Sequence, residues 1–210
     1  MRERYDEELK ILNEEILQMA TLSEIAIDKA VSLICAYDED VNKEVCELEE
    51  RIDSMENRIQ THCLRLILEQ QPVARDLRTI SSALKMITDL ERIGDQARDI
   101  AEICSNFQNT CNFESIEHIK EMAKATIEII KNTINSFIDR NIDAARGIVD
   151  EDDIVDNYFV KVRDDLIKEI EKKHPNAPDI IDLIMIAKYL ERIADHAVNI
   201  SRWVIFSIEG

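Results

Sequence analysis

The sequence predicts an all-α fold of six long helices, arranged as two tandem antiparallel three-helix bundles. The 210 residues include only three glycines and three prolines, so few positions favour tight turns. Charged residues make up 33% of the chain and aromatic residues 5%, a composition typical of long helices. Apolar residues also recur three and four positions apart over long stretches, which is the spacing of one helix face.

Three such stretches fill the first half of the chain. The first has an apolar seam from Leu9 to Tyr37 and is followed by acidic residues 38–40. The second begins its seam at Val45 and ends at Gln71-Pro72, because proline disfavours helix in the residue before it. The third carries a seam over 77–100. The polar, asparagine-rich residues 105–112 then break the pattern, which predicts two bundles of residues 1–107 and 112–210.

The second half repeats this organisation. A fourth helix is predicted from about Glu114 to Phe137, and a fifth over 141–173. A second proline turn follows at 174–178, and the sixth helix is expected to end near Trp203 or Phe206. Helices of this length span about 45 Å, and each is too amphipathic to be stable alone. Packing three of them together in each half buries their apolar faces.

The two halves share an acidic motif. Residues 90–100 read LERIGDQARDI and residues 190–200 read LERIADHAVNI, with seven of eleven positions identical. A repeat of this kind indicates one structural unit used twice. Glu91 and Asp95, like Glu191 and Asp195, are four positions apart and therefore lie on one helix face, about 6 Å apart along the axis.

Each half also has a second acidic pair, on the helix before the motif. These pairs are Glu49 with Asp53, and Asp152 with Asp156. In the first half both pairs lie roughly 20 residues from Pro72, so antiparallel helices would bring them to a similar height. The acids point away from the apolar seam. We therefore predict an acidic groove on the outside of each bundle.

Converging carboxylates favour a cation site. Like charges four apart destabilise a helix by roughly 0.2–0.5 kcal/mol per pair, and several carboxylates raise one another's pKa. A bound multivalent cation reverses this cost, and oxygen ligands suit Mg²⁺, Ca²⁺, Mn²⁺ or iron. With so many carboxylates in one groove, a site could hold more than one metal ion. The alternative is a solvated acidic helix face, since single pairs of this spacing are common in acidic proteins.

Composition excludes several classes of protein. The formal net charge of −18 argues against nucleic-acid binding but leaves cations and basic protein surfaces as partners. Residues 1–10 are mostly charged and no run of about 18 apolar residues exists, which predicts no signal peptide and no membrane span. The five scattered cysteines form no CxxC pair, which is typical of a reducing cytoplasm. No phosphate loop, nucleophile elbow or catalytic triad spacing is present.

Histidines and arginines are secondary candidates. His62 falls on a core-facing position, whereas His196 projects to a different face from Glu191 and is a weaker candidate ligand. A ferritin-like di-iron site would need a Glu-x-x-His motif on two helices, and no such pair is present. The other candidates are basic side chains near the motifs. Arg75 and Arg78 are expected to bind an anion or partner or to be solvated, and Arg92 and Arg192 to form ion pairs.

These motifs resemble the PhoU family, which comprises bacterial and archaeal regulators of phosphate uptake and signalling. The likeness covers nearly the whole chain and is most specific in QPVARDLR at 71–78 and in the two copies of the acidic motif. The resemblance implies two tandem three-helix bundles and a cytoplasmic regulator without enzymatic activity. Such a regulator links a phosphate ABC transporter to a sensor histidine kinase and restrains uptake when phosphate is plentiful. Long amphipathic bundles leave apolar flanks to cover, so we also expect a homodimer.

The resemblance also implies metal ions or multinuclear iron clusters on the bundle surface. The ligands it implies are Glu49, Asp53, Glu91, Asp95 and Asp99 in the first half, and Asp152, Asp156, Glu191, Asp195 and Asn199 in the second. Asn199 departs from the all-carboxylate pattern, which predicts weaker binding or a different metal in the second site. The choice among Fe, Mn, Mg, Zn and Ca stays open.

Two other functions fit the same residues. One is a helical accessory protein of another transporter that binds no metal. The other is a carboxylate-bridged metalloenzyme, which the outward-facing acids and the lack of histidine ligands disfavour. In each case we expect contact with the membrane only through partner proteins, and no nucleic-acid partner.

Overall fold

Six long helices account for nearly all of the described chain. The computed structural model describes residues 2–70, 72–107, 115–172 and 177–209, and at 2–4, 70, 150 and 151 only the backbone. The helices are α1 (Arg2–Ser32), α2 (Glu39–Gln70), α3 (Ala74–Cys104), α4 (Ser115–Ile138), α5 (Ile142–Glu171) and α6 (Ala177–Glu209). No strand occurs in these ranges. The prediction of an all-α fold with six long helices is confirmed.

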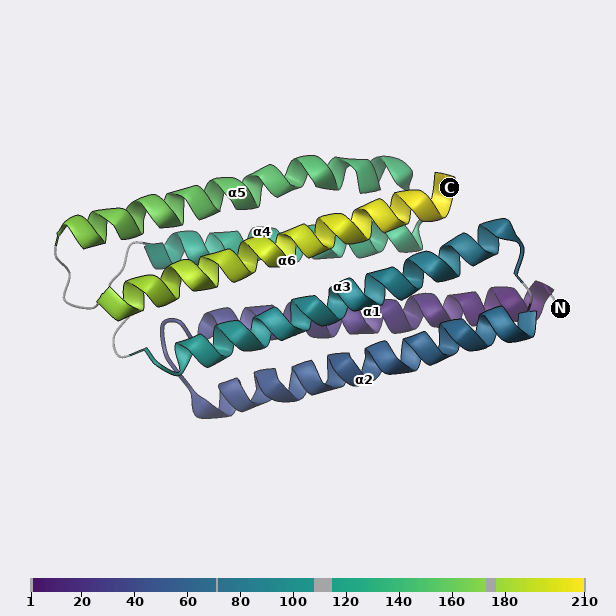
Figure 1. Cartoon of the computed structure of the whole chain (residues 1–210), viewed down its shortest axis with the longest axis horizontal. Coiled ribbons are helices and arrows are strands. Elements are labelled where there is room, and N and C mark those ends of the chain that lie inside the picture. The colour runs from purple at the N-terminus through teal and green to yellow at the C-terminus, as the bar shows by residue number, and fades with distance from the viewer. Residues whose placement is uncertain (1, 71, 108–114, 173–176, 210) are drawn as a thin grey trace.

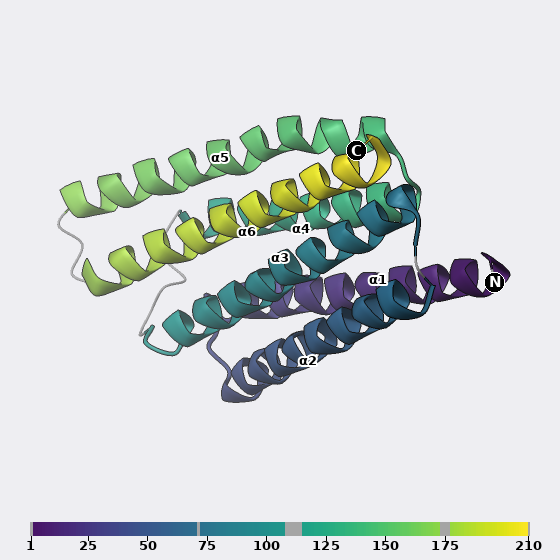
Figure 2. The ribbon, with the colours of Figure 1, turned by 45° about the vertical axis from the view of Figure 1, so that its right-hand side comes forward.

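The helices form two groups of three that lie side by side (Figure 1). Within each group every helix contacts the other two. Between the groups, α3 packs against α6 and α1 packs against α4. Figures 1 and 2 show α3 and α6 running antiparallel through the middle of the molecule. These two helices carry the repeated acidic motif, so its two copies lie on neighbouring helices at the centre of the molecule.

The end of α1 differs from the prediction. The helix ends at Ser32, whereas its apolar seam predicted a helix reaching Tyr37. The backbone N–H groups of Leu33 and Ile34 bond to carbonyls three residues earlier, which tightens the chain into a turn. Asp38 Oδ1 then accepts two N–H groups of the first turn of α2, at 2.9 and 3.3 Å. Local capping therefore ends one helix and begins the next inside a continuous apolar pattern.

Other boundaries follow the sequence signals more closely. Asn141 caps α5, because its Oδ1 accepts the N–H of Ala144 at 3.1 Å. By contrast, α6 continues to Glu209, beyond the predicted end near Trp203 or Phe206, since no glycine or proline interrupts it there. The predicted connection at 105–112 and the proline turns at 71–72 and 174–178 lie partly outside the described residues.

The core is aliphatic and extends through all six helices as one cluster. The predicted seams are buried along most of their length, but Tyr37 and Leu77 are exposed. Burial raises the pKa of the Cys63 and Cys104 thiols to about 12, so these cysteines are packing residues and not thiolates. Among the described residues, none of the helices combines the length and the apolar character that a membrane span requires.

Candidate metal-binding grooves

The first groove forms where α2 and α3 approach closely. Gly94 of α3 faces the buried side chain of Ile52 on α2, and a Cβ at Gly94 would lie 3.0 Å from Ile52 Cδ1. The missing side chain lets the helices pack at this distance, which is a physical reason for a glycine inside a helix. In the second half, the equivalent positions hold Val155 and Ala194, both fully buried. The acidic residues flank these contacts.

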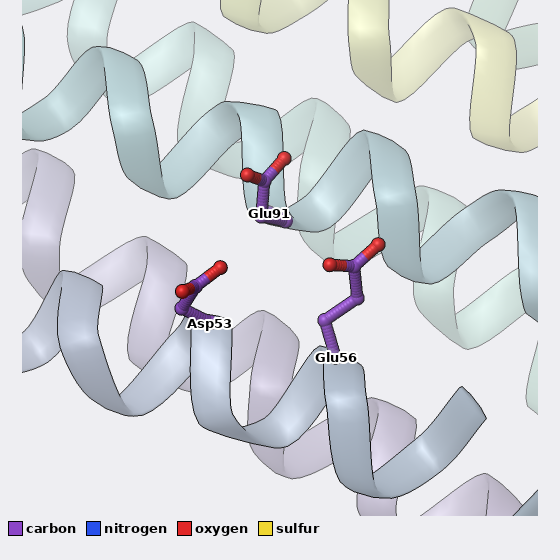
Figure 3. A group of neighbouring side chains, drawn as sticks. All are labelled: Asp53, Glu56 and Glu91. Carbon is purple, nitrogen blue, oxygen red and sulfur yellow. The ribbon is translucent and has the colours of Figure 1, made fainter. Parts of the chain in front are cut away.

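Three carboxylates converge in the first groove. Asp53, Glu56 and Glu91 each offer an oxygen, and these oxygens all lie within 4.8 Å of one another. Figure 3 shows the side chains of Asp53 and Glu56 reaching from α2 toward Glu91 on α3. Asp53 is exposed and the other two are half-buried. A cluster of three carboxylate oxygens open to solvent is a donor set that suits hard cations.

The carboxylates oppose one another's ionisation. Burial raises the pKa of Glu91 most, followed by the charge of Asp95. Arg92 works in the opposite direction, while Glu56 and Asp53 add smaller increases. The raised pKa means that a negative charge on Glu91 is unfavourable here, and that a cation in the groove would favour its ionised form.

Arginines hold three of the predicted ligands. Arg92 lies beside Glu91, with Nε 3.4 Å from Oε2, and beside Asp95, with Nη1 3.0 Å from Oδ2. Arg98 Nη1 lies 3.0 Å from Oε1 of Glu49. The groove therefore contains two kinds of acid. Glu91, Asp95 and Glu49 lie beside arginines, whereas Asp53 and Glu56 have no basic side chain within 4.0 Å among the described residues.

Glu56 was missing from the predicted set. It follows Asp53 by three positions, which places both on one face of α2, so helical spacing could have found it. The prediction rested on acids four positions apart and therefore passed over this spacing. The structure adds a further contact, because Thr88 of α3 donates its hydroxyl to Glu56 Oε1 at 3.0 Å.

The second groove brings together the four predicted acids of α5 and α6. The pKa of Asp152 is raised to about 6, most by burial and then by the charges of Asp156, Asp195 and Glu191, in that order. The pKa of Asp156 is raised by burial and then by Glu191 and Asp195. Lys188 forms an ion pair with Glu191. Among the described residues, no three acids here converge as closely as Asp53, Glu56 and Glu91.

Asp99 and Asn199 lie on the sides of their helices that face the other half. Burial raises the pKa of Asp99, and a hydrogen bond from the hydroxyl of Tyr189 on α6 opposes this increase. Asn199 Oδ1 accepts from Arg202 at 3.0 Å and lines a cavity between α6 and α3. Both residues are therefore engaged at the α3–α6 contact, and their role as metal ligands stays a prediction.

Both histidines considered as candidates, His62 and His196, are engaged by carboxylates. His62 is 7% exposed and, as expected, is a satisfied core histidine: Nδ1 lies 2.8 Å from Glu15 Oε2 and Nε2 lies 3.0 Å from Glu8 Oε2. His196 Nδ1 lies 2.8 Å from Asp89 Oδ1 on α3. A carboxylate only accepts hydrogen bonds, so Nδ1 of His196 is the donor. The imidazole of His196 thus joins the two halves, and its other nitrogen has no carboxylate within 4.0 Å in the described chain.

The predicted arginine pairs have different outcomes. Arg92 forms ion pairs with its acidic neighbours, as expected. Within the described ranges Arg192 has no carboxylate within 4.0 Å, and Lys188 is the cation that pairs with Glu191 instead. Arg75 is exposed, and Arg78 has a buried Nε without a hydrogen-bond partner in the described residues. Binding of an anion or partner by these two arginines stays a prediction.

Comparison with known proteins identifies the family. A family model described as the PhoU domain matches residues 16–104 and 119–204, which together span most of the chain and both helical groups. The chain belongs to the PhoU family. The match covers both copies of the acidic motif, so the resemblance predicted from these motifs is confirmed.

Relatives are similar over their whole length. A phosphate-specific transport system accessory protein PhoU homolog from Clostridium acetobutylicum is 30% identical over 210 residues, covering 100% of this chain and 96% of the relative. A homolog of the same name from Aquifex aeolicus is 31% identical over 203 residues, covering 97% and 92%.

Solved PhoU structures have the same fold. The crystal structure of PhoU from Pseudomonas aeruginosa aligns with a TM-score of 0.87 at 27% identity, covering 98% of this chain and 99% of the other. The phosphate transport system regulatory protein PhoU from Streptococcus pneumoniae aligns with a TM-score of 0.89 over 98% and 97% of the two chains. At 24% identity, the second likeness concerns the fold alone.

Proposed function

We propose that this PhoU protein is a regulatory accessory protein of phosphate transport. It would bind a phosphate ABC transporter and a sensor histidine kinase, and restrain phosphate uptake and the phosphate-starvation response when phosphate is plentiful. The observation that carries the proposal is the full-length similarity to relatives named as phosphate-specific transport accessory proteins. The family match to both halves supports it, because both repeats of the family domain are present.

The mechanism we propose is binding, without a chemical reaction. Long helices packed on one continuous aliphatic core provide a rigid surface for docking. The net charge of −18 favours partner surfaces rich in lysine and arginine, and long-range attraction of this kind raises association rates. Regulation then depends on which partner surface the helices cover.

We further propose that cations bind in the two acidic grooves. Asp53, Glu56 and Glu91 would hold a cation in the first groove, and Asp152, Asp156, Glu191 and Asp195 would hold one in the second. The convergence of carboxylate oxygens and the raised pKa values of Glu91 and Asp152 support this. Oxygen donors fit Mg²⁺, Mn²⁺, Ca²⁺ or iron. A bound cation would neutralise the groove and stiffen the contact between the two helices.

The regulatory role is tested genetically. In the native host, deletion of the gene should raise phosphate uptake and phosphate-starvation transcription in phosphate-rich medium. If a host that contains the relevant kinase shows unchanged uptake and transcription, the proposal is wrong. Complementation with the double variant Asp53→Asn/Glu91→Gln then separates the roles, because restored regulation would show that the first groove is not needed for it.

The expected homodimer stays a prediction, which light scattering in solution tests.

The cation site is tested directly on the purified protein. The double variant Asp53→Asn/Glu91→Gln should hold less metal than the wild type, because two of the three converging carboxylates lose their charge. A matched control is Glu50→Gln, which removes an exposed acid of α2. Elemental analysis after dialysis against dilute Mn²⁺ measures the difference. Equal metal content in all three proteins, or none in the wild type, would contradict the site.

A further inference from the structure

A cavity outside the acidic grooves lies between α3 and α6. Its volume is about 550 Å³, which is within the range of small-molecule sites. The side chains that line it combine two cations, one carboxylate (Asp89), aromatic rings and neutral polar groups. They include Lys85 and Thr88 from α3, and Asn199, Arg202, Trp203 and Phe206 from α6. Of the metal ligands predicted from the sequence, Asn199 lines this cavity, whereas the converging carboxylates of the two grooves do not.

Two aromatic rings form one side of the cavity. The Trp203 and Phe206 rings are perpendicular, with centroids 6.0 Å apart. Phe206 is 40% exposed, and Trp203 is half-buried and packs against the core with part of its surface still accessible. Aromatic rings in a cavity favour planar ligands, because stacked and edge-on contacts add to the gain from removing apolar surface from water.

The cations of the cavity are not neutralised. Across the described residues Lys85 has no carboxylate within 4.0 Å, and the hydrogen bond of Arg202 goes to the neutral amide of Asn199. The one acid at the wall, Asp89, is bonded to His196. Lys85 and Arg202 thus line one cavity, and among the described residues neither has a carboxylate within 4.0 Å. They create a local site for an anion.

The counterpart positions in the repeat do not share this lining. One hundred positions away, the counterparts of its lining are different in charge and size. Met185 stands for Lys85, Asp99 for Asn199, Glu102 for Arg202 and Ile103 for Trp203. The counterpart side of the α3–α6 contact is therefore acidic and lacks the indole. Only one side of a duplicated contact has acquired both cations and an aromatic pair, so its composition is not a by-product of the duplication.

We propose that this cavity binds a nucleotide. The planar base would lie against Trp203 and Phe206, and the phosphate groups would receive charge-assisted hydrogen bonds from Lys85 and Arg202. Inorganic phosphate alone would leave the aromatic wall unused, and a neutral aromatic compound would leave the two cations unpaired. A nucleotide offers a planar base to the aromatic side chains and phosphate groups to the two cations. This ligand is distinct from the cations proposed for the acidic grooves. Under the proposed function, it would be a second signal to a regulator of phosphate transport.

Ligand binding can be followed by the intrinsic tryptophan fluorescence of the protein. Trp203 is the single tryptophan, so a ligand beside it changes the only indole signal in the protein. We expect ADP, titrated in buffer with EDTA, to change this signal saturably, with one ADP bound per chain by calorimetry. Lys85→Gln and Arg202→Gln should each weaken binding roughly tenfold, because each removes a charge-assisted contact. Glu102→Gln, at the counterpart of Arg202, should bind as the wild type does.

The same titrations can overturn the proposal. It fails if calorimetry and fluorescence detect no saturable binding at millimolar ADP. It also fails if the double variant Lys85→Gln/Arg202→Gln, shown to be helical by circular dichroism, binds ADP as tightly as the wild type. Adenosine tests the contacts with the aromatic side chains alone, and inorganic phosphate tests the contacts with Lys85 and Arg202 alone. Each should bind more weakly than ADP. If inorganic phosphate binds as tightly as ADP, the aromatic wall has no part in recognition and the nucleotide assignment is wrong.

Discussion

The two acidic grooves occupy equivalent places in the repeat but balance their charge differently. In the first, Arg92 and Arg98 hold Glu91, Asp95 and Glu49. In the described part of the second, one lysine forms an ion pair with one of the four acids. The pKa of Asp152 is accordingly raised to about 6. The repeated helices thus place the carboxylates at equivalent positions. Where arginines lie nearby, they balance the negative charge; where they do not, the pKa of a carboxylate rises and it binds a proton more readily.

The helix contacts beneath the two grooves also differ. In the first half one side chain of the contact is larger by one carbon, and its partner is smaller by one carbon. The first half has Ile52 against Gly94, and the equivalent positions of the second half hold Val155 and Ala194. The larger residue on one helix is offset by the smaller residue on the other. Both pairs therefore fill a similar volume, although neither position is the same in the two halves.

The largest expected effect concerns this packing. Gly94→Leu should lower the free energy of unfolding by about 1–3 kcal/mol, because the new side chain overlaps the buried Ile52. Urea unfolding followed by circular dichroism measures it. Exchanging the pair for that of the second half, with Ile52→Val and Gly94→Ala together, should leave stability within about 1 kcal/mol of the wild type, since helix propensity offsets the lost methylene. The single variants Ile52→Val and Gly94→Ala are measured as well. If their changes in the free energy of unfolding sum to that of the double variant, the two side chains do not constrain each other.

A smaller effect is expected from the unpaired acids of the second groove. The pKa of Asp152 is raised on folding, so the folded chain binds its proton more tightly than the unfolded chain does. Stability should therefore fall as pH rises from about 4 to about 6, and Asp152→Asn should remove this loss. At neutral pH in EDTA, we expect the variant to be more stable by about 1 kcal/mol, allowing for screening by solvent. An equal gain at pH 4 and pH 7 would show that the ionisation of Asp152 is not responsible.

The smallest stability effect is expected from the arginines of the first groove. Arg98→Gln should change the free energy of unfolding by less than about 1 kcal/mol, because the ion pair with Glu49 is on the surface. It should nevertheless strengthen Mn²⁺ binding a few-fold, since Glu49 is released and a positive charge is removed. Calorimetry measures the affinity. Arg192→Gln in the second half is the matched control, and an equal gain there would show that the pairing of Arg98 is irrelevant.

Local patterns predicted most of the fold and the acids of both grooves. Apolar spacing located the six helices, and acids four apart located the residues on each outer face. The features that these patterns missed depend on contacts between distant helices. The engagement of Asp99 and Asn199 at the α3–α6 contact requires knowing that these helices are neighbours, which no local period reveals. The pairing of Arg98 with Glu49 depends on how α2 and α3 are aligned along their length.

The central contact between α3 and α6 also affects how the chain folds. Each helix belongs to its own three-helix group and at the same time packs against the other group, and the core is continuous across them. Neither group can leave the other without exposing apolar surface of both central helices to water. We therefore expect the two repeats to unfold in one cooperative transition. Separately produced halves should reassociate into the native arrangement, because each supplies the surface that the other lacks.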